Sequence, residues 1–207
     1  MSADRLRAFI ALELSEEALR ATTLAIRSLQ AWAPEGIRWT PPEARHLTLK
    51  FLGDLDAELV PRLQAGIASR IAHEPPFGIQ LAGLGAYPDA RAARVVWLGV
   101  SKGAGPLARL ARRIDAAAKR LGVARERRPF QAHVTLGRLR QPRRIHLERA
   151  QAPEPVTLEV ARVTLFESRL DAAGATYVPL AQLPLPAGDE PGSPDFAPEP
   201  EEMPDGT

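Results

Sequence analysis

The sequence predicts an α+β fold built from two lobes with approximate internal symmetry. One tripeptide pattern occurs twice, as His46-Leu47-Thr48 and as His133-Val134-Thr135, each time in a similar apolar frame. Each copy lies in a strand–helix–strand half of the chain, which suggests that the halves are related. The 207 residues are 45% hydrophobic, enough for one substantial core or for two small lobes that share a cleft.

The first half is predicted from apolar periodicity and from capping residues. Residues 5–14 read as a strand, and Ser15 caps a following helix that has Glu16 and Glu17 in its first turn, where the helix dipole favours acids. A short strand at 36–39 precedes the turn at Pro41-Pro42. The helix that Ser15 caps has an inward-facing stripe formed by Leu19, Thr22, Ile26 and Leu29.

The first histidine strand is expected at 46–52, and Asp56 is expected to cap the next helix, which ends at Pro75-Pro76. Strands at 77–84 and 94–100 follow, and Gly122 stops a third helix. The second helix is predicted from the inward-facing stripe Leu59, Leu63, Ile67 and Ile71. The third helix is predicted from the stripe Leu107, Leu110, Ile114, Ala117 and Leu121.

The second histidine strand is expected at 133–139, and strands at 156–167 and 175–183 complete the fold. Residues 1–185 therefore form one folded body. Residues 186–207 are rich in Pro and Gly and should be a disordered acidic tail, because they offer almost nothing to bury.

Charge is distributed unevenly along the chain. The tail holds seven of the 25 acidic residues and no Lys or Arg, so the first 185 residues carry 27 bases against 18 acids. A basic body suits binding of a polyanion, although a general bias towards Arg, Ala and Pro explains the charge equally well. The chain has no Cys, no signal-like start and no stretch long enough to span a membrane, so we expect a cytoplasmic protein.

The repeated tripeptide suits acid–base chemistry on a phosphate. Residues i and i+2 of a strand point to the same face, so each copy presents an imidazole beside a hydroxyl, with Leu47 and Val134 turned to the core. Two facing histidines can activate an attacking oxygen and protonate a leaving oxygen. The hydroxyls of Thr48 and Thr135 can donate hydrogen bonds to the other phosphate oxygens.

Simpler explanations compete with this interpretation. A lone histidine on a strand is most often structural, and only the duplication in matching frames argues otherwise. Zinc is disfavoured because there is no His-Glu-x-x-His spacing and no evident third ligand, so we expect no metal and no cofactor.

Neighbouring cations allow two interpretations. Lys50 shares strand parity with His46 and either faces the phosphate or is an edge-strand charge. Arg138 has the wrong parity relative to His133 unless a bulge turns it. The arginines around the second histidine strand form either a rim facing RNA or a solvated charge run: they are Arg125, Arg127, Arg128, Arg138, Arg140, Arg143 and Arg144.

At these residues the chain resembles the two-histidine (2H) phosphoesterases, specifically the RNA 2′,3′-cyclic phosphodiesterases once called 2′-5′ RNA ligases. The resemblance covers roughly residues 5–185 and departs at Gln131-Ala132, where the family usually has Thr-Pro. Its matching blocks are residues 7–12, 39–43, 46–53, 95–100, 128–130, 133–138 and 165–168.

The resemblance implies a bilobal α+β domain in which two antiparallel sheets with outer helices flank a central V-shaped cleft. It implies hydrolysis of an RNA 2′,3′-cyclic phosphate end to a 2′-phosphate. By position, His46 would be the general acid and His133 the general base. The phosphate would be held by three residues, Thr48, Thr135 and Arg138.

Two alternatives stay open. The same site could join a 2′-5′ RNA linkage, or the chain could bind RNA ends without turnover, although both His and both Thr are present. We expect a monomer that acts on RNA cyclic ends or small cyclic nucleotides.

Overall fold

The structure, a computed structural model, describes residues 4–126, 128–170 and 174–186. Arg127 of the predicted rim and nearly all of the predicted tail, residues 187–207, lie outside this part. In chain order the elements are β1 (Arg5–Glu13), α1 (Glu16–Gln30), β2 (Ile37–Trp39), β3 (His46–Asp56), α2 (Val60–Ile71), β4 (Phe77–Tyr87), β5 (Ala93–Lys102), α3 (Ala104–Arg120), β6 (His133–Arg143), β7 (Val156–Val160), β8 (Arg162–Leu170) and β9 (Ala175–Pro184).

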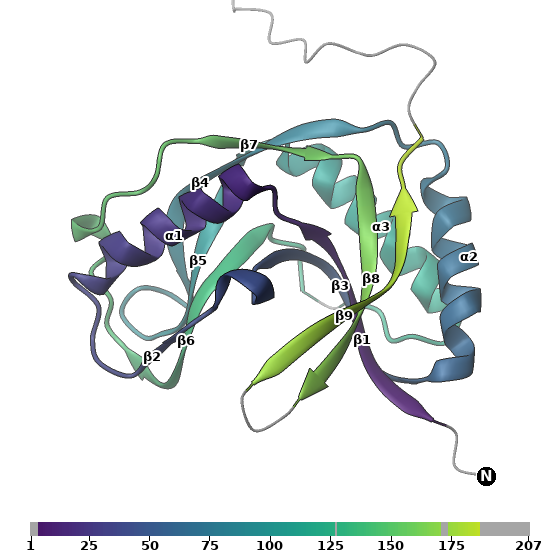
Figure 1. Cartoon of the computed structure of the whole chain (residues 1–207), viewed down its shortest axis with the longest axis horizontal. Coiled ribbons are helices and arrows are strands. Elements are labelled where there is room, and N and C mark those ends of the chain that lie inside the picture. Colours follow the sequence, from purple (N-terminus) through teal and green to yellow (C-terminus); the bar gives the residue numbers. More distant parts are fainter. Residues whose placement is uncertain (1–3, 127, 171–173, 187–207) are drawn as a thin grey trace, which may run out of the picture.

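The strands form one connected antiparallel sheet in the order β7-β4-β5-β6-β3-β1-β8-β9. The short strand β2 pairs with β6 farther along β6 than the residue that pairs with β3. This corrects the expectation of two separate sheets. The physical reason is that β3 and β6 meet at one residue pair, Leu47 with Val134, both fully buried. The sheet therefore consists of two halves that diverge from this pair, and Figure 1 shows it strongly curled.

Helices α1 and α3 precede the two histidine strands, and each follows a strand of one half of the sheet but packs mainly against the other half. Helix α1 follows β1 but packs against β6 and β7, whereas α3 follows β5 and packs mainly against β3, with a smaller contact to β4. Helix α2 packs against α3 and β9, so the two helices lie together on the half that contains β8 and β9 (Figure 1). The apolar side chains beneath these helices form one continuous core across both halves.

Most predicted elements are confirmed, and two details are wrong. Ser15 caps α1, since its Oγ accepts a hydrogen bond from the Ala18 amide. Asp56 makes no side-chain cap, because a short 3₁₀ turn separates it from α2. The single strand predicted at 156–167 is divided at Ala161, where the chain crosses from β7, beside β4, to β8, beside β1.

A glycine in β4 makes room for the indole ring that packs near the second histidine. Gly85 pairs with Trp97, and an added Cβ would overlap that ring. We expect Gly85→Ala to lower the free energy of unfolding by about 1–3 kcal/mol, the usual effect of overpacking. Urea unfolding followed by circular dichroism would measure the change.

The matched control is Gly66→Ala in α2, where an added methyl makes only ordinary contact with Leu121. There the expected change is a gain of roughly 0.5–1 kcal/mol, because alanine is the better helix former. Equal effects at the two positions would contradict the overlap of the Gly85 methyl with the indole ring.

Candidate functional site

The junction of the two sheet halves places the two tripeptides beside each other. Because β3 and β6 are antiparallel and Leu47 opposes Val134, each histidine lies next to the strand position of the other tripeptide's threonine. Leu47, Leu49, Val134 and Leu136 are buried and the His and Thr side chains of both tripeptides are half-buried, so the latter share the opposite face. The predicted alternation is confirmed from His46 to Leu49 and from His133 to Leu136.

Both histidine strands contain a bulge at the third residue after the histidine. In β3, Thr48 and Lys50 pair with consecutive residues of β1, which leaves Leu49 as the extra residue. In β6, Leu136 is the extra residue against β5 in the same way. A bulge reverses the alternation of side chains beyond it, so the fourth residue turns to the core and the fifth to the histidine face.

The bulge in β6 brings Arg138 to the histidine face. Arg138 is exposed and close enough to both histidines to influence their pKa values. The predicted site residues His46, Thr48, His133, Thr135 and Arg138 are therefore brought to one place.

The bulge in β3 turns Lys50 away from this face. The interpretation that Lys50 faces the phosphate is therefore wrong. Its side chain points into the protein, where the residue is only 4% exposed. The Nζ atom lies 2.7 Å from the Asp115 Oδ1 atom and donates to the Ala124 carbonyl at 2.7 Å. The edge-strand alternative is also wrong, since β3 lies inside the sheet.

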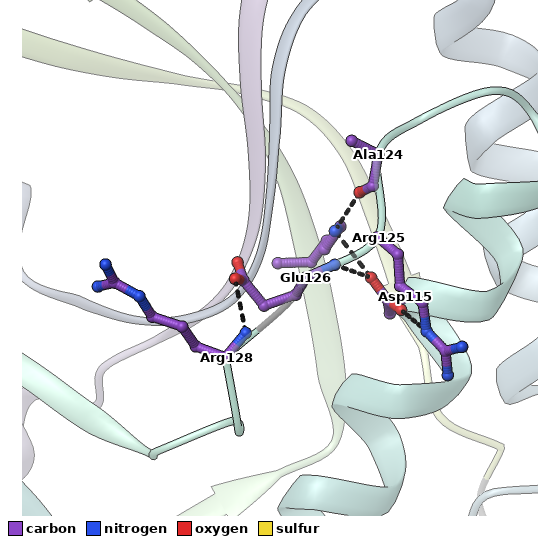
Figure 2. A network of polar contacts seen from close by, with 6 residues as sticks. Asp115, Ala124, Arg125, Glu126 and Arg128 are labelled. Carbon is purple, nitrogen blue, oxygen red and sulfur yellow. Dashed lines mark hydrogen bonds and ion pairs between the residues drawn. The ribbon is translucent and has the colours of Figure 1, made fainter.

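Through Lys50, Asp115 joins β3 to the loop that leads to His133. Figure 2 shows the contacts of Asp115 with Arg125 and Glu126 of this loop. Besides Lys50, its carboxylate accepts a hydrogen bond from the Glu126 amide at 3.1 Å and lies 3.4 Å from the Arg125 Nε atom. Burial would raise the pKa of the Asp115 carboxyl, but Lys50 and the other donors hold it below its ordinary value. The same loop lines a cavity of about 720 Å³, to which neither histidine contributes.

Aromatic rings surround each histidine. On one side, the ring centroids of Phe9 and Tyr177 lie 4.7 and 5.0 Å from that of His46. The side chain of Phe51, the fifth residue after His46, is 59% exposed on this face, with its ring 6.3 Å from Phe9.

On the other side, the ring centroid of Tyr87 lies 5.1 Å from that of His133, and Trp97 lies 6.1 Å away. The sequence interpretation missed these neighbours because they come from strands far away in the chain. The sequence did contain a signal for Phe51, because Phe51 follows His46 by five positions, just as Arg138 follows His133.

Each histidine ring is oriented by the backbone two residues before it. The Nδ1 atom of His133 lies 2.8 Å from the Gln131 carbonyl, and His46 hydrogen bonds to the backbone of Ala44. In the neutral ring, donation from Nδ1 to a carbonyl leaves Nε2 of His133 as the proton acceptor. Arg45 fixes the turn before His46, because it donates to the Thr40 carbonyl and to hydroxyls of α1.

The environment favours neutral rings. Burial is the largest influence on His46 and, together with the positive charges of Arg138 and His133, lowers its pKa to about 4, although the hydrogen bond to Ala44 raises it. Burial and Arg138 also lower the pKa of His133, against a hydrogen bond to Gln131 that raises it. A bound anion would act in the opposite direction on both rings.

Two further observations concern the described residues alone. In this part of the chain, no three His, Asp or Glu side chains come close enough together to ligate a metal ion. None of the helices there combines the length and the hydrophobicity that crossing a membrane requires.

The sequence is similar to a known family over most of its length. The family described as the 2′-5′ RNA ligase superfamily matches residues 16–172. An RNA 2′,3′-cyclic phosphodiesterase of Methanothermobacter thermautotrophicus is 32% identical over 178 residues, which cover 84% of this chain and 95% of the relative. A protein of the same name from Escherichia coli is 32% identical over 188 residues, covering 86% and 96%.

Solved structures share the fold. A Thermus thermophilus protein aligns with a TM-score of 0.73 and 28% identity, covering 88% of this chain and 99% of that one. Escherichia coli LigT in complex with 3′-AMP aligns with a TM-score of 0.69 and 26% identity, again covering 88% and 99%. The curled antiparallel sheet with its outer helices is therefore the arrangement of these proteins.

The pair of Lys50 and Asp115 can be tested by stability. Asp115→Ala leaves a buried ammonium group without its partner, and we expect the free energy of unfolding to fall by about 3–5 kcal/mol. Urea unfolding of the single variant and of Lys50→Met/Asp115→Leu would measure this. The double variant should regain most of the loss, and a double variant as unstable as the single one would contradict the pairing.

Proposed function

This chain belongs to the 2′-5′ RNA ligase superfamily, and we propose that it hydrolyses the 2′,3′-cyclic phosphate at RNA ends to a 2′-phosphate. The observation that carries the proposal is the meeting of two His-x-Thr strands at one residue pair, which gathers His46, His133 and Arg138 on one face. The names of the relatives, which are called RNA 2′,3′-cyclic phosphodiesterases, support the choice of substrate.

In the proposed reaction, water attacks phosphorus on the side opposite the 3′ oxygen. His133 accepts a proton from the water as the new phosphorus–oxygen bond forms. His46 donates a proton to the 3′ oxygen as its bond to phosphorus breaks, so the phosphate stays on the 2′ oxygen. This division of roles follows the family resemblance, and the carbonyl that fixes Nδ1 of His133 supports a base that accepts at Nε2.

The remaining polar groups are proposed to hold the phosphate. Thr48 and Thr135 would donate hydrogen bonds to the non-bridging oxygens, and the Arg138 guanidinium would balance the charge that grows in the transition state. Two positioned rings and these donors provide proton transfer and charge stabilisation from side chains alone, so we propose a reaction that needs no metal.

The protonation states of the two histidines that the reaction needs depend on the bound substrate. In the protein alone both rings are mainly neutral at pH 7, whereas the reaction needs one charged ring. The negative charge of the bound phosphate would raise the pKa of the nearest histidine and so supply the acid when substrate is present. LigT was solved in complex with phosphate and with 3′-AMP, which supports an anion site in this fold.

Phe51 is the proposed platform for the terminal base. A large apolar side chain with 59% exposure beside a phosphate site offers a flat surface in the position where a base would follow its ribose. The underlying ring of Phe9 holds this surface in place.

We further propose that the two halves act as lobes of related topology on either side of a V-shaped cleft. The order of strand, helix and histidine strand supports this, since α1 and the short β2 lie between β1 and β3, and α3 lies between β5 and β6. The bulges at equivalent positions support it as well. Both histidines come from one chain, so a monomer would suffice, and RNA ends as substrate together with the absence of Cys fit the cytoplasm.

The acid–base pair predicts a steep loss of turnover in each single variant. We expect His46→Ala and His133→Ala to lower kcat on 2′,3′-cyclic AMP by about 10²–10⁴-fold, because each positioned ring supplies a proton transfer. The double variant should fall little further, since the two rings act as one unit. Phosphorus NMR of the product would show which hydroxyl keeps the phosphate.

The matched control is His73→Ala, which changes a histidine just after the end of α2 and should leave kcat unchanged. Activity should survive chelator treatment. A 3′-phosphate product would refute the roles assigned to the rings, and joining of an added 5′-hydroxyl strand would support the ligase alternative.

We expect removal of the positive charge of Arg138 to shift the pH–rate profile. Its positive charge lowers the pKa of both histidines, so Arg138→Gln should raise both values. The acidic limb, where the base must lose its proton, and the alkaline limb, where the acid must keep its proton, should both move to higher pH. The same change should lower kcat/KM by about 10²-fold, and a profile with unmoved limbs would place Arg138 away from the rings.

A further inference from the structure

Two arginines face each other across neighbouring strands beside the histidines. Arg38 of β2 is the direct partner of Arg138 of β6, and directly opposed residues of antiparallel strands point to the same face. Like charges in this arrangement repel each other. Both side chains are exposed, and neither forms a salt bridge among the described residues.

Arg140 extends this row along β6. Leu139 is buried between two exposed arginines, which places Arg140 on the face of Arg138, while the pairing of β6 with β5 is irregular between Arg138 and Arg143. At about 3.3 Å per residue, Arg140 lies roughly 7 Å beyond Arg138, on the side away from His133.

Arg38 reaches from one half of the sheet towards the other. An added Cβ on Gly174, next to the start of β9, would lie 3.8 Å from the Arg38 Nη2 atom. Since β2 belongs to the half with β6, and β9 forms the far edge of the other half, this guanidinium extends over the space between the halves. It therefore lies beside the proposed phosphate position without being one of the groups assigned to it.

We propose that Arg38 and Arg140 form a second anion site, which binds the phosphodiester immediately upstream of the cyclic end. This inference rests on the proposed function and makes it more specific, because the substrate becomes an oligonucleotide rather than a mononucleotide. An anion bound by Arg38, next to the phosphate assigned to Arg138, would offset the repulsion between the two guanidinium groups.

RNA is the polyanion that the geometry favours. The basic row begins at the residue assigned to the reacting phosphate and continues along one strand, as a chain of evenly spaced phosphates requires. A mononucleotide cyclic phosphate has no further phosphate and would leave Arg38 and Arg140 without a partner.

The test compares two substrates that share their terminal nucleoside, 2′,3′-cyclic AMP and a tri-adenylate with a 2′,3′-cyclic end. For Arg38→Gln and Arg140→Gln we expect kcat/KM on the trimer to fall about tenfold each, with the mononucleotide unchanged. The slope of log kcat/KM on the trimer against log salt should become shallower by about 0.7 for each arginine that no longer binds a phosphate. Arg38→Lys should keep the salt dependence, because the charge remains.

The matched control is Arg112→Gln, which removes an exposed arginine of α3 that forms no salt bridge within the described part of the chain and should change neither substrate. Equal losses on both substrates would place Arg38 at the reacting phosphate or in the fold and overturn the proposal. Trimer kinetics unaffected by either variant would overturn it as well.

Failure of the broader function gives a different result. Wild-type protein that turns over neither substrate would refute the cyclic phosphodiesterase itself. Wild-type protein that turns over both with the same efficiency and the same salt slope would refute only the second anion site.

Discussion

The backbone pairing of Leu47 with Val134 is the contact on which the geometry of the site depends. It is the residue pair through which β3 and β6 meet, and both side chains are fully buried beneath it. Side chains alternate along a strand, so a slip of one residue would turn His46 into the core and a leucine onto the open face. Burial of the two apolar side chains opposes such a slip, and the hydrophobic core thereby fixes which polar groups face the substrate.

Desolvation and charge act together on the two rings. A histidine enclosed by aromatic side chains loses hydration that would stabilise its charged form, and the neighbouring Arg138 acts in the same direction. The rings by themselves therefore have low proton affinity. In the proposed reaction an arriving phosphate would reverse this balance, since it would neutralise the arginine and attract a proton to the nearest ring, so the site would acquire its acid from the ligand on which it acts.

The sequence predicted the parts of this molecule that follow from local periodicity. Alternation within each tripeptide strand placed His46 and His133 on the open face, and the helical stripes located all three helices to within a few residues. Strand parity left a bulge open as the way to turn Arg138, but it could not locate the bulges at Leu49 and Leu136. An extra leucine in a strand is as apolar as its neighbours and leaves the hydrophobic pattern intact. Lys50 was misplaced for this reason, and its partner Asp115 lies in a helix that periodicity cannot bring to a particular strand.

The exchange of helices between the halves has a consequence for how the molecule unfolds. Because α1 covers β6 and β7 while α3 covers β3, removing either helix would expose apolar surface belonging to the opposite half. Neither half has a complete core that it could keep alone. The interlocked chain should therefore lose its structure in a single cooperative transition, and neither half should persist as an autonomous foldon once the other has melted.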